Sequence, residues 1–266
     1  MDVIDCAADR FLFCIPDLTA VAGVLVSEEL GTVFSSNRGE DTIGVLPISD
    51  VQNVTKIKVG IRPNGLSIDP GRGLLLAANV GNPDTPVSHT LSIVDVERRR
   101  MIHSIPVAGR TRWTIFDPAN ECFFVNIADP FEIAVVESAD PTRIARFIEV
   151  PARGPHGLDI DPASRRLFCA CDAGMLYALD LESGKVLLSA LLSGAPDVIF
   201  FDAARKHLYV AVGEPGVIDV FETDGLELVE TVTTGKGAHT LGFDAAHNKV
   251  YAFLPESHCA AVCVDE

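Results

Sequence analysis

The sequence predicts an all-β fold built from repeated four-stranded antiparallel sheets, and three observations carry this prediction. A segment of two short apolar runs joined by an Asp-containing turn recurs along the chain, and its copies are spaced 41 to 48 residues apart. Each full repeat holds four strand-like runs, separated by turns rich in Gly, Pro, Asp and Ser. A period of roughly 40 to 50 residues with four strands per unit is typical of a β-propeller. The aligned turn residues are Asp69, Asp117, Asp161, Asp202 and Asp244.

The repeat divides the chain into blades of a single propeller domain, expected to span residues 1–266. Residues 1–19 match only the third and fourth strands of a unit, and the last segment, 236–266, lacks its outer strand. Both fragments contain a third strand, and one blade cannot use both. The sequence therefore favours seven blades in plan, the first incomplete, with six blades as the alternative. The full blades are expected at 20–60, 61–109, 110–154, 155–194 and 195–235.

The composition of the chain indicates a folded protein and argues against some classes of binding partner. The chain has 266 residues, of which 48% are hydrophobic and 22% charged, which is enough to bury a sizeable core. The net charge of −16 argues against nucleic acid and anionic membranes as partners, because phosphate groups are bound by clustered Lys and Arg. No apolar stretch is long enough to span a bilayer, and the start lacks the order of a signal peptide. The chain as given is therefore expected to be cytoplasmic.

The seven cysteines lie in strand-like runs without the spacing of a disulfide framework, which indicates reduced core thiols. Cys169 and Cys171 lie two apart on one strand and face the same way. A CxC pair also occurs in soft-metal sites, but this one lacks the second pair that such sites use.

The aligned Asp residues have a structural explanation. Their carboxylates can accept hydrogen bonds from backbone amides two residues on and so hold the turn between the first and second strands. We therefore exclude them from the candidate site. The sequence also contains no GxSxG, Walker or HExxH motif, which argues against serine-type acyl transfer and nucleotide hydrolysis.

Four short motifs resemble those of a known repeat family. The segments PNGLSIDP and PHGLDIDP, the run LYVAV and the third strand IDVFET are similar to the YVTN, or YncE-like, seven-bladed propellers with WD40-like repeats. The resemblance covers nearly the whole chain and implies the fold, but this family groups many proteins of unassigned activity. Its members typically begin with a strand that pairs in the last blade. This sequence lacks that strand, so its start looks shortened and an upstream export signal stays open.

One column of the repeat is polar and differs between blades. It lies five residues before each aligned Asp, where the innermost strand begins. In a propeller the second strand ends on the same face, so residues at these two places converge around the central axis. The first set contains Asn64, Arg112, His156, Asp197 and His239. The second set contains Asn37, Asn79, Asn126 and Asp172.

Metal binding is the sharpest hypothesis for this column. His156, Asp197 and His239 supply two imidazoles and one carboxylate on consecutive blades, a set that suits Zn²⁺, Fe²⁺ or Mn²⁺. Asparagine carbonyls would complete an oxygen-rich site for Ca²⁺ or Mg²⁺ as the other option. Such an ion polarises a substrate carbonyl or lowers the pKa of a bound water.

The remaining residues would hold a substrate. Arg112 can clamp a carboxylate or stabilise an oxyanion, with Trp113 as an apolar wall. Asn64 and Asn126 would orient the substrate. Asp159 is either a local partner of the adjacent blade or a general base. Further substrate contacts are expected from Asn37, Asn79 and Asp172.

Two functions follow from this site. The first is a metal-assisted enzyme, a hydrolase such as a lactonase or a lyase, acting on a small carbonyl-bearing or anionic molecule; these reaction classes enter by analogy with other propellers. The alternative is a non-catalytic propeller that binds a small ligand or a protein partner on the same face. In that case His156, Asp197 and His239 hydrogen-bond to one another and need no ion.

Overall fold

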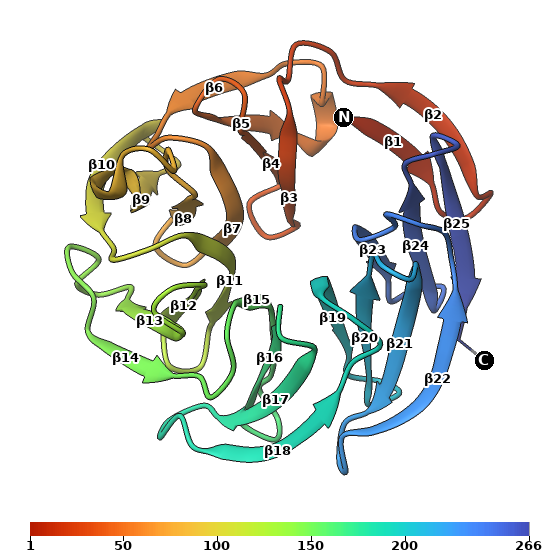
Figure 1. Cartoon of the computed structure of the whole chain (residues 1–266). Helices are drawn as coiled ribbons and strands as arrows, with labels where there is room; N and C mark the ends of the chain where they lie inside the picture. Colours follow the sequence, from red (N-terminus) through yellow and green to blue (C-terminus); the bar gives the residue numbers. More distant parts are fainter. Residues whose placement is uncertain (266) are drawn as a thin grey trace. The chain divides into compact units, whose positions relative to one another are not determined.

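The computed structural model describes residues 1–265, which form an all-β structure (Figure 1). Two short 3₁₀ segments, η1 (Ile48–Asp50) and η2 (Pro86–Ser88), interrupt the loops. Successive strands pair antiparallel within each sheet. The predicted class of four-stranded antiparallel blades is therefore confirmed. The part of the chain that the structure describes holds no helix long and apolar enough to cross a membrane.

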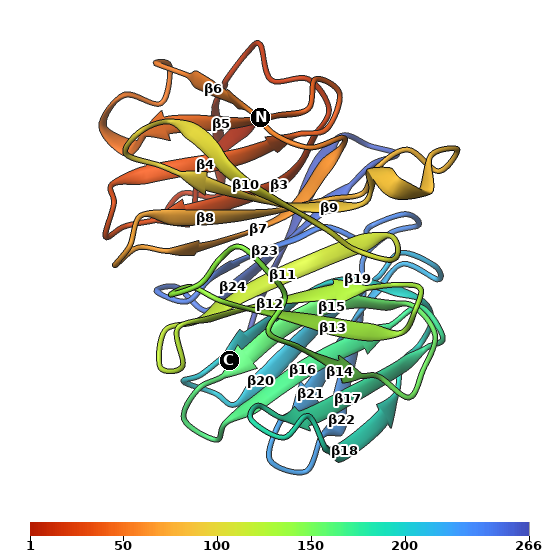
Figure 2. The ribbon, with the colours of Figure 1, turned by 90° about the vertical axis from the view of Figure 1, so that its left-hand side faces the viewer.

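Unit 1 comprises residues 1–3 and 12–149 and contains three complete blades. Figure 2 shows two of their sheets, β7–β10 and β11–β14, lying side by side. Ile105 and Val107, at the end of one blade, pack against Phe123 and Val125 of the next. Apolar burial between sheets thus stabilises the unit. The blades are β3 (Val21–Ser27), β4 (Thr32–Asn37), β5 (Thr42–Pro47) and β6 (Thr55–Lys58); β7 (Pro63–Asp69), β8 (Leu74–Asn79), β9 (Thr90–Asp95) and β10 (Arg100–Pro106); and β11 (Thr111–Asp117), β12 (Cys122–Ile127), β13 (Glu132–Glu137) and β14 (Arg146–Glu149).

Unit 2 comprises residues 4–11 and the chain from Val150 onward. Two of its blades have four strands and the third has three. Phe168 of the first blade and Leu208 and Phe221 of the second share one buried cluster. The blades are β15 (Pro155–Asp161), β16 (Arg166–Cys171), β17 (Met175–Asp180) and β18 (Val186–Leu191); β19 (Pro196–Asp202), β20 (His207–Val212), β21 (Val217–Glu222) and β22 (Glu227–Thr233); and β23 (Leu241–Asp244), β24 (Lys249–Leu254) and β25 (Cys259–Val264).

The blade count corrects one expectation. Strands β1 (Asp2–Asp5) and β2 (Arg10–Cys14) form a two-stranded sheet of their own. Within residues 1–265, the sheets of three or more strands number six, which is the alternative count. The preferred plan of seven blades fails on this count because residues 1–19 supply no inner strands for a blade. Each sheet nevertheless lies inside one of the predicted blade segments, whereas the single domain of residues 1–266 stays a prediction.

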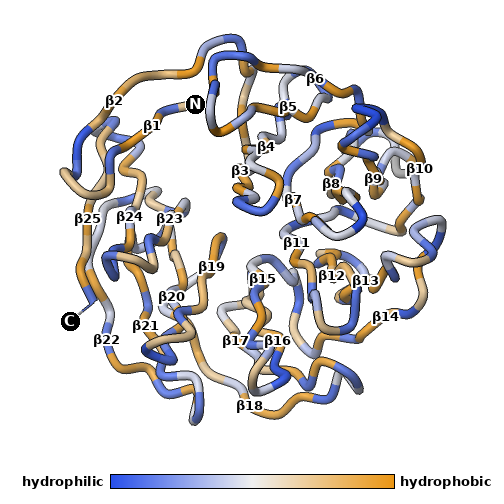
Figure 3. Tube along the Cα trace, turned by 180° about the vertical axis from the view of Figure 1, so that it is seen from behind, coloured by the Kyte–Doolittle hydropathy of each residue, from blue (hydrophilic) through white to orange (hydrophobic). Residues whose placement is uncertain are grey.

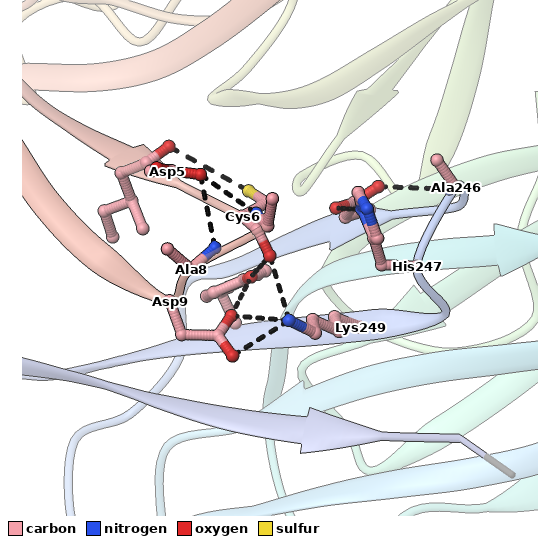
Figure 4. A network of polar contacts seen from close by, with 11 residues as sticks. Asp5, Cys6, Ala8, Asp9, Ala246, His247 and Lys249 are labelled. Atoms are coloured by element: carbon pink, nitrogen blue, oxygen red, sulfur yellow. Dashed lines mark hydrogen bonds and ion pairs between the residues drawn. The ribbon is translucent and has the colours of Figure 1, made fainter.

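The turn between β1 and β2 is fixed to β24 within unit 2 (Figure 4). Lys249 Nζ donates to both carboxylate oxygens of Asp9, at 2.8 Å each, and to the carbonyl oxygen of Cys6 at 2.9 Å. The hydroxyl of Tyr251 donates to Asp9 Oδ1 at 2.6 Å. The hydrogen bond from Lys249 and the one from Tyr251 hold the pKa of Asp9 below its usual value of 3.8.

The repeated Asp holds each first turn as the sequence predicts. In four blades its Oδ1 accepts from the amide two residues on, for example Asp161 from Ala163 at 3.0 Å and Asp202 from Ala204 at 2.8 Å. Asp69 differs slightly, since it accepts from the amide of Arg72. Figure 3 shows hydrophobic strands such as β12 and β18 joined by many hydrophilic turns, the pattern from which the blades were predicted.

Candidate functional site

A β-bulge lies at the start of the innermost strands β7, β11, β15 and β19 and contains their residues of the polar column, whereas β23 has no bulge and His239 lies before it. The strand register shifts between Pro63 and Leu66, between Thr111 and Thr114, between Pro155 and Gly157, and between Pro196 and Ile199. A bulge inserts an extra residue into the strand and re-aims its side chain, which is why bulges recur at functional sites. The residues inside these bulges include Asn64, Arg112, His156 and Asp197.

In unit 2 the column forms a polar network that runs across three blades. His156 Nδ1 lies 2.6 Å from Asp172 Oδ1, and its Nε2 lies 3.2 Å from Asp197 Oδ1. The other oxygen of Asp197, Oδ2, lies 3.8 Å from His239 Nε2. His239 Nδ1 lies 2.6 Å from the Gly237 carbonyl oxygen. The two predicted imidazoles therefore meet at one carboxylate.

A glycine lets the inner strands approach closely enough for this network. A Cβ added at Gly157 would lie 2.6 Å from the Asp197 carbonyl oxygen. Real Cβ atoms do not come so close to backbone oxygen, so a larger residue would push β15 and β19 apart. Gly157 therefore positions His156 and Asp197, one on each strand, for contact.

The side chains of the network are covered to different extents, and that of Asp172 is 33% exposed. The side chain of His156 is 11% exposed, Asp197 is 26% exposed and His239 is 54% exposed. A carboxylate only accepts hydrogen bonds, so the two that flank His156 are satisfied together only when both ring nitrogens carry hydrogen. The His239 Nδ1 faces a carbonyl oxygen and must donate to it, which leaves Nε2 as an acceptor in the neutral ring. The network thus contains two carboxylates, one on each side of His156.

Asp159 lies on β15 but bonds elsewhere. Its Oδ1 accepts from the amide of Ile160 at 2.8 Å, and its Oδ2 accepts from the amide of Phe201 on β19 at 2.7 Å. Burial raises the pKa of Asp159 to about 6, although the amide donors of Phe201 and Ile160 act in the opposite direction. This geometry makes the residue a partner of the adjacent blade, the first of its two expected roles; the general-base role stays a prediction.

In unit 1, two residues that were predicted to contact substrate, Asn37 and Asn79, form side-chain hydrogen bonds within their own blades. Asn79 Nδ2 lies 3.0 Å from Thr90 Oγ1 and 2.9 Å from Ser92 Oγ, both on β9. Asn37 Nδ2 donates to Thr42 Oγ1 on β5 at 3.0 Å. Asn37 and Asn79 are fully buried. These bonds give the two amides a structural role, and a substrate-binding role for them stays a prediction.

The other unit 1 candidates lie at comparable strand positions. Asn64 is buried, its side-chain oxygen accepts from Arg38, and its carbonyl oxygen accepts from Ser36 Oγ at 2.7 Å. Arg112 and Trp113 are half-buried at the start of β11, and Asn126 is fully buried near the end of β12. Clamping and orienting roles for these four residues stay predictions.

Across residues 1–265, no group of three or more His, Cys, Asp or Glu side chains is already arranged to hold a metal ion. In the network, both ring nitrogens of His156 face carboxylates. The thiols of Cys169 and Cys171 lie 4.0 Å apart and are fully buried. All seven thiols are free as predicted, and core burial is confirmed for this pair, but it is wrong for Cys14 and Cys259, which are exposed.

Two features of the site were not predicted from the sequence. Asp172 was expected to contact substrate, whereas its carboxylate bonds His156 directly. Its position one residue past the end of β16, opposite the start of β15, is the signal that could have revealed this pairing. The Gly237 carbonyl that orients His239 carries no side-chain signal at all.

Comparison with known proteins supports the fold only. No family model matches the chain, and no curated protein sequence matches it. Among solved structures, a chain of the Kuenenia stuttgartiensis hydrazine synthase is similar at 16% identity, with a TM-score of 0.65 over 96% of this chain and 98% of that one. A chain in a crystal structure of the mitotic checkpoint complex is similar at 10% identity, with a TM-score of 0.82 over 99% of this chain and 81% of that one. At these identities the likeness shows that the chain has a β-propeller fold.

Proposed function

We propose that the chain is a non-catalytic binding propeller, of the YVTN type, whose unit 2 network receives a positively charged group of its ligand. The observation that carries this proposal is the Asp197 carboxylate between two imidazoles, with its second oxygen facing His239 Nε2 at 3.8 Å. That distance is too long for a hydrogen bond. An ammonium group placed between the two atoms can donate to both.

Charge supports the same ligand. The network contains the carboxylates of Asp172 and Asp197, and the whole chain carries a formal charge of −16. Such a field raises the local concentration of cations and speeds their association. The Asp197 and His239 side chains are accessible to a ligand, as Asp172 is at the other end of the network, whereas His156 is mostly covered.

A protein partner that presents a lysine is one source of the ammonium group, and a free amine is the other. The solved chain from the mitotic checkpoint complex belongs to a multi-protein assembly, which supports a partner-binding role for a propeller of this kind. The shared chemistry, a primary ammonium held by one carboxylate and one neutral imidazole, is what the experiment tests.

The test is a calorimetric titration with Nα-acetyl-lysine amide, compared with Nα-acetyl-norleucine amide, which has the same four-carbon side chain without the ammonium group. We expect the lysine compound alone to bind, and Asp197→Asn to weaken it by about tenfold, because one charge-assisted hydrogen bond is lost. The control is His247→Gln, which alters another His–Asp pair of unit 2, His247 Nδ1 to Asp244 Oδ2 at 2.7 Å, outside the network. Equal binding of both compounds, or no effect of Asp197→Asn, contradicts the proposal.

A divalent metal is the second candidate for the positive charge. Each imidazole offers its Nδ1 to an oxygen, that of Asp172 or of the Gly237 carbonyl, and turns its Nε2 toward Asp197. Metal-ligating histidines are oriented in this way. An ion would require His156 to exchange its contact with Asp197 for the metal, and the ligands would then be His156, Asp197 and His239. The predicted hydrolase or lyase activity depends on such an ion as Lewis acid.

Titration with Zn²⁺ or Mn²⁺ alone separates the two candidates. Stoichiometric uptake by the native protein that is lost in His156→Ala with His239→Ala favours the metal. If the protein takes up no metal, or if the double variant takes up as much as the native protein, the metal-assisted enzyme is ruled out. The ammonium site is then tested by its own titration alone.

A further inference from the structure

A cavity of about 350 Å³ opens between the last two blades of unit 2, away from the polar network. Its walls come from strands β20, β21 and β22 on one side and β24 and β25 on the other. This volume is at the lower end of the range of sites that enclose small molecules.

The cavity has a cause in the sequence of the last blade. Val250 on β24 pairs with Cys263 on β25. The same register position holds larger side chains in other blades, namely Phe123 with Val136 and Leu208 with Phe221. Close-packed interiors leave few voids, so the smaller Val–Cys pair leaves space that the other blades fill.

The floor of the cavity is apolar and buried. Ile218, Val220 and Val250 are each less than a tenth exposed and line it. Ile218 pairs with Val232, and Val220 pairs with Glu230, so one wall is built from two cross-strand pairs. An apolar group entering the cavity would therefore be removed from water on several sides, which is favourable.

One end of the cavity holds a closed polar cluster. The Tyr209 hydroxyl and His207 Nδ1 each lie 2.6 Å from Asp265 Oδ2. Desolvation raises the pKa of Asp265, but its bonds to Tyr209 and His207 outweigh this and hold the pKa below 3.8. The charge of this carboxylate is thus already matched by donors from the protein.

The rim carries a carboxylate that is not matched. Glu230 is exposed and lines the cavity, and its carboxylate has no hydrogen bond or ion pair with any other residue in 1–265. Burial, together with the nearby charge of Glu230, raises the pKa of the Cys263 thiol, so the thiol stays neutral and brings no second charge. An unopposed negative charge beside an apolar cavity selects a ligand of opposite charge.

We propose that this cavity binds a small apolar molecule with one positively charged nitrogen. The apolar part lies on Ile218, Val220 and Val250, and the ammonium group meets Glu230 at the rim. The site is independent of the network around Asp197, because none of the network residues lines the cavity.

The test uses 2-phenylethylamine as probe, followed by the methyl NMR signals of Val and Ile and by calorimetry. Its neutral and anionic counterparts, 2-phenylethanol and phenylacetate, serve as matched ligands. We expect the amine to shift the signals of Ile218 and Val250, and Glu230→Gln to weaken its binding by about fivefold or more, because the charge partner is lost. Val250→Phe, which places a Phe123-like ring in the cavity, should abolish binding while the melting transition stays cooperative.

Two controls make the result decisive. Glu227→Gln removes an exposed carboxylate from the same strand outside the cavity and should leave the shifts of the Ile218 and Val250 signals unchanged. The calorimetry is done in the Asp197→Asn background, which lacks the other proposed ammonium site. The proposal is overturned if the amine shifts no cavity signal, if phenylacetate binds as tightly, or if Glu227→Gln and Glu230→Gln weaken binding equally.

Discussion

The two units join neighbouring inner strands at the same repeat positions but with different chemistry. Two residues before the aligned Asp, unit 1 has Ser67, whose hydroxyl lies 2.8 Å from that of Thr114 on the next blade. Unit 2 has Asp159 in this place, bonded to the amide of Phe201 on its next blade. Five residues before the aligned Asp, unit 1 has Asn64 and Arg112, neither of which changes its charge at physiological pH, whereas unit 2 has His156 in contact with Asp197.

This comparison shows that the same blade structure can join neighbouring inner strands through two kinds of polar contact. The bulge, the turn and the strand pairing are common to both units, so they do not decide the chemistry. Hydroxyl and amide groups form bonds that are the same at every physiological pH, whereas carboxylates and imidazoles form bonds that depend on protons. Unit 2 should therefore be the pH-sensitive half of the molecule.

The largest expected effect is the pH dependence that Asp159 gives to unit 2. Its pKa is about 6 in the folded protein, against 3.8 for a free carboxyl, so the folded protein holds an extra proton between these values. The stability that this proton contributes is fully present below pH 3.8 and is lost as the pH rises through 6. The free energy of unfolding of the native protein relative to Asp159→Asn should fall by about 3 kcal/mol between about pH 4 and 7, measured by urea denaturation.

Asp161→Asn is the control with the opposite sign. Desolvation raises the pKa of Asp161, but bonds from Ser164 and Lys206 together hold it below 3.8. Its contribution is present above that value and is lost as the pH falls. Parallel pH profiles for the two variants would refute the assignment of Asp159.

The next effect comes from the glycines that let inner strands approach. A Cβ at Gly157 would lie 2.6 Å from the Asp197 carbonyl oxygen, and one at Gly65 would lie 2.7 Å from that of Arg112. Gly157→Ala and Gly65→Ala should each lower the free energy of unfolding by about 2 kcal/mol through overpacking. Only Gly157→Ala should also weaken binding of the lysine compound, because only this change displaces Asp197.

Gly242→Ala is the matched control, since a Cβ there meets nothing within 4 Å. A similar loss of stability in this variant would mean that the cost at Gly157 is one of backbone conformation rather than contact.

Ser67→Ala probes the neutral junction of unit 1. Removing the hydroxyl leaves Thr114 without this bond and should cost about 1 kcal/mol. Because neither group titrates, the loss should be the same at about pH 5 and pH 8 in urea unfolding. If the loss of unfolding free energy in Ser67→Ala changes with pH, the proposed difference between the units is wrong.

The smallest effect on stability is expected for Asp197→Asn. The amide oxygen can still accept from His156 Nε2, and the site is partly exposed, so the change should be less than about 0.5 kcal/mol. Thermal unfolding should therefore separate this variant, which folds normally and loses ligand, from Gly157→Ala, which loses both. A large loss of stability in Asp197→Asn would assign the network a structural role.

The strands and turns could be predicted because their causes are local. The carboxylate of each aligned Asp bonds an amide two or three residues away, so the sequence contains both partners. The position of the polar column could also be predicted, since it depends only on counting from the Asp. The meeting of His156 and His239 at Asp197 follows from that count and from the order of the blades.

The direction and burial of individual side chains could not be predicted in the same way. Asn79 points to Thr90 and Ser92 because β8 and β9 pair in one particular register, which alternation alone does not fix. The cavity beside Val250 depends on volumes summed over two sheets. The blade count depended on whether β1 and β2 pair with other strands, which their residues do not specify.

The bonds from Lys249 to Asp9 and Cys6 join residues about 240 positions apart along the chain. During synthesis the β1–β2 turn must wait for about 240 further residues before this partner exists, and contacts of such long sequence separation form late and slowly. Until then Phe11, already 61% exposed in the finished protein, has little to cover it. We expect the nascent chain to be most vulnerable to aggregation and chaperone capture in that interval.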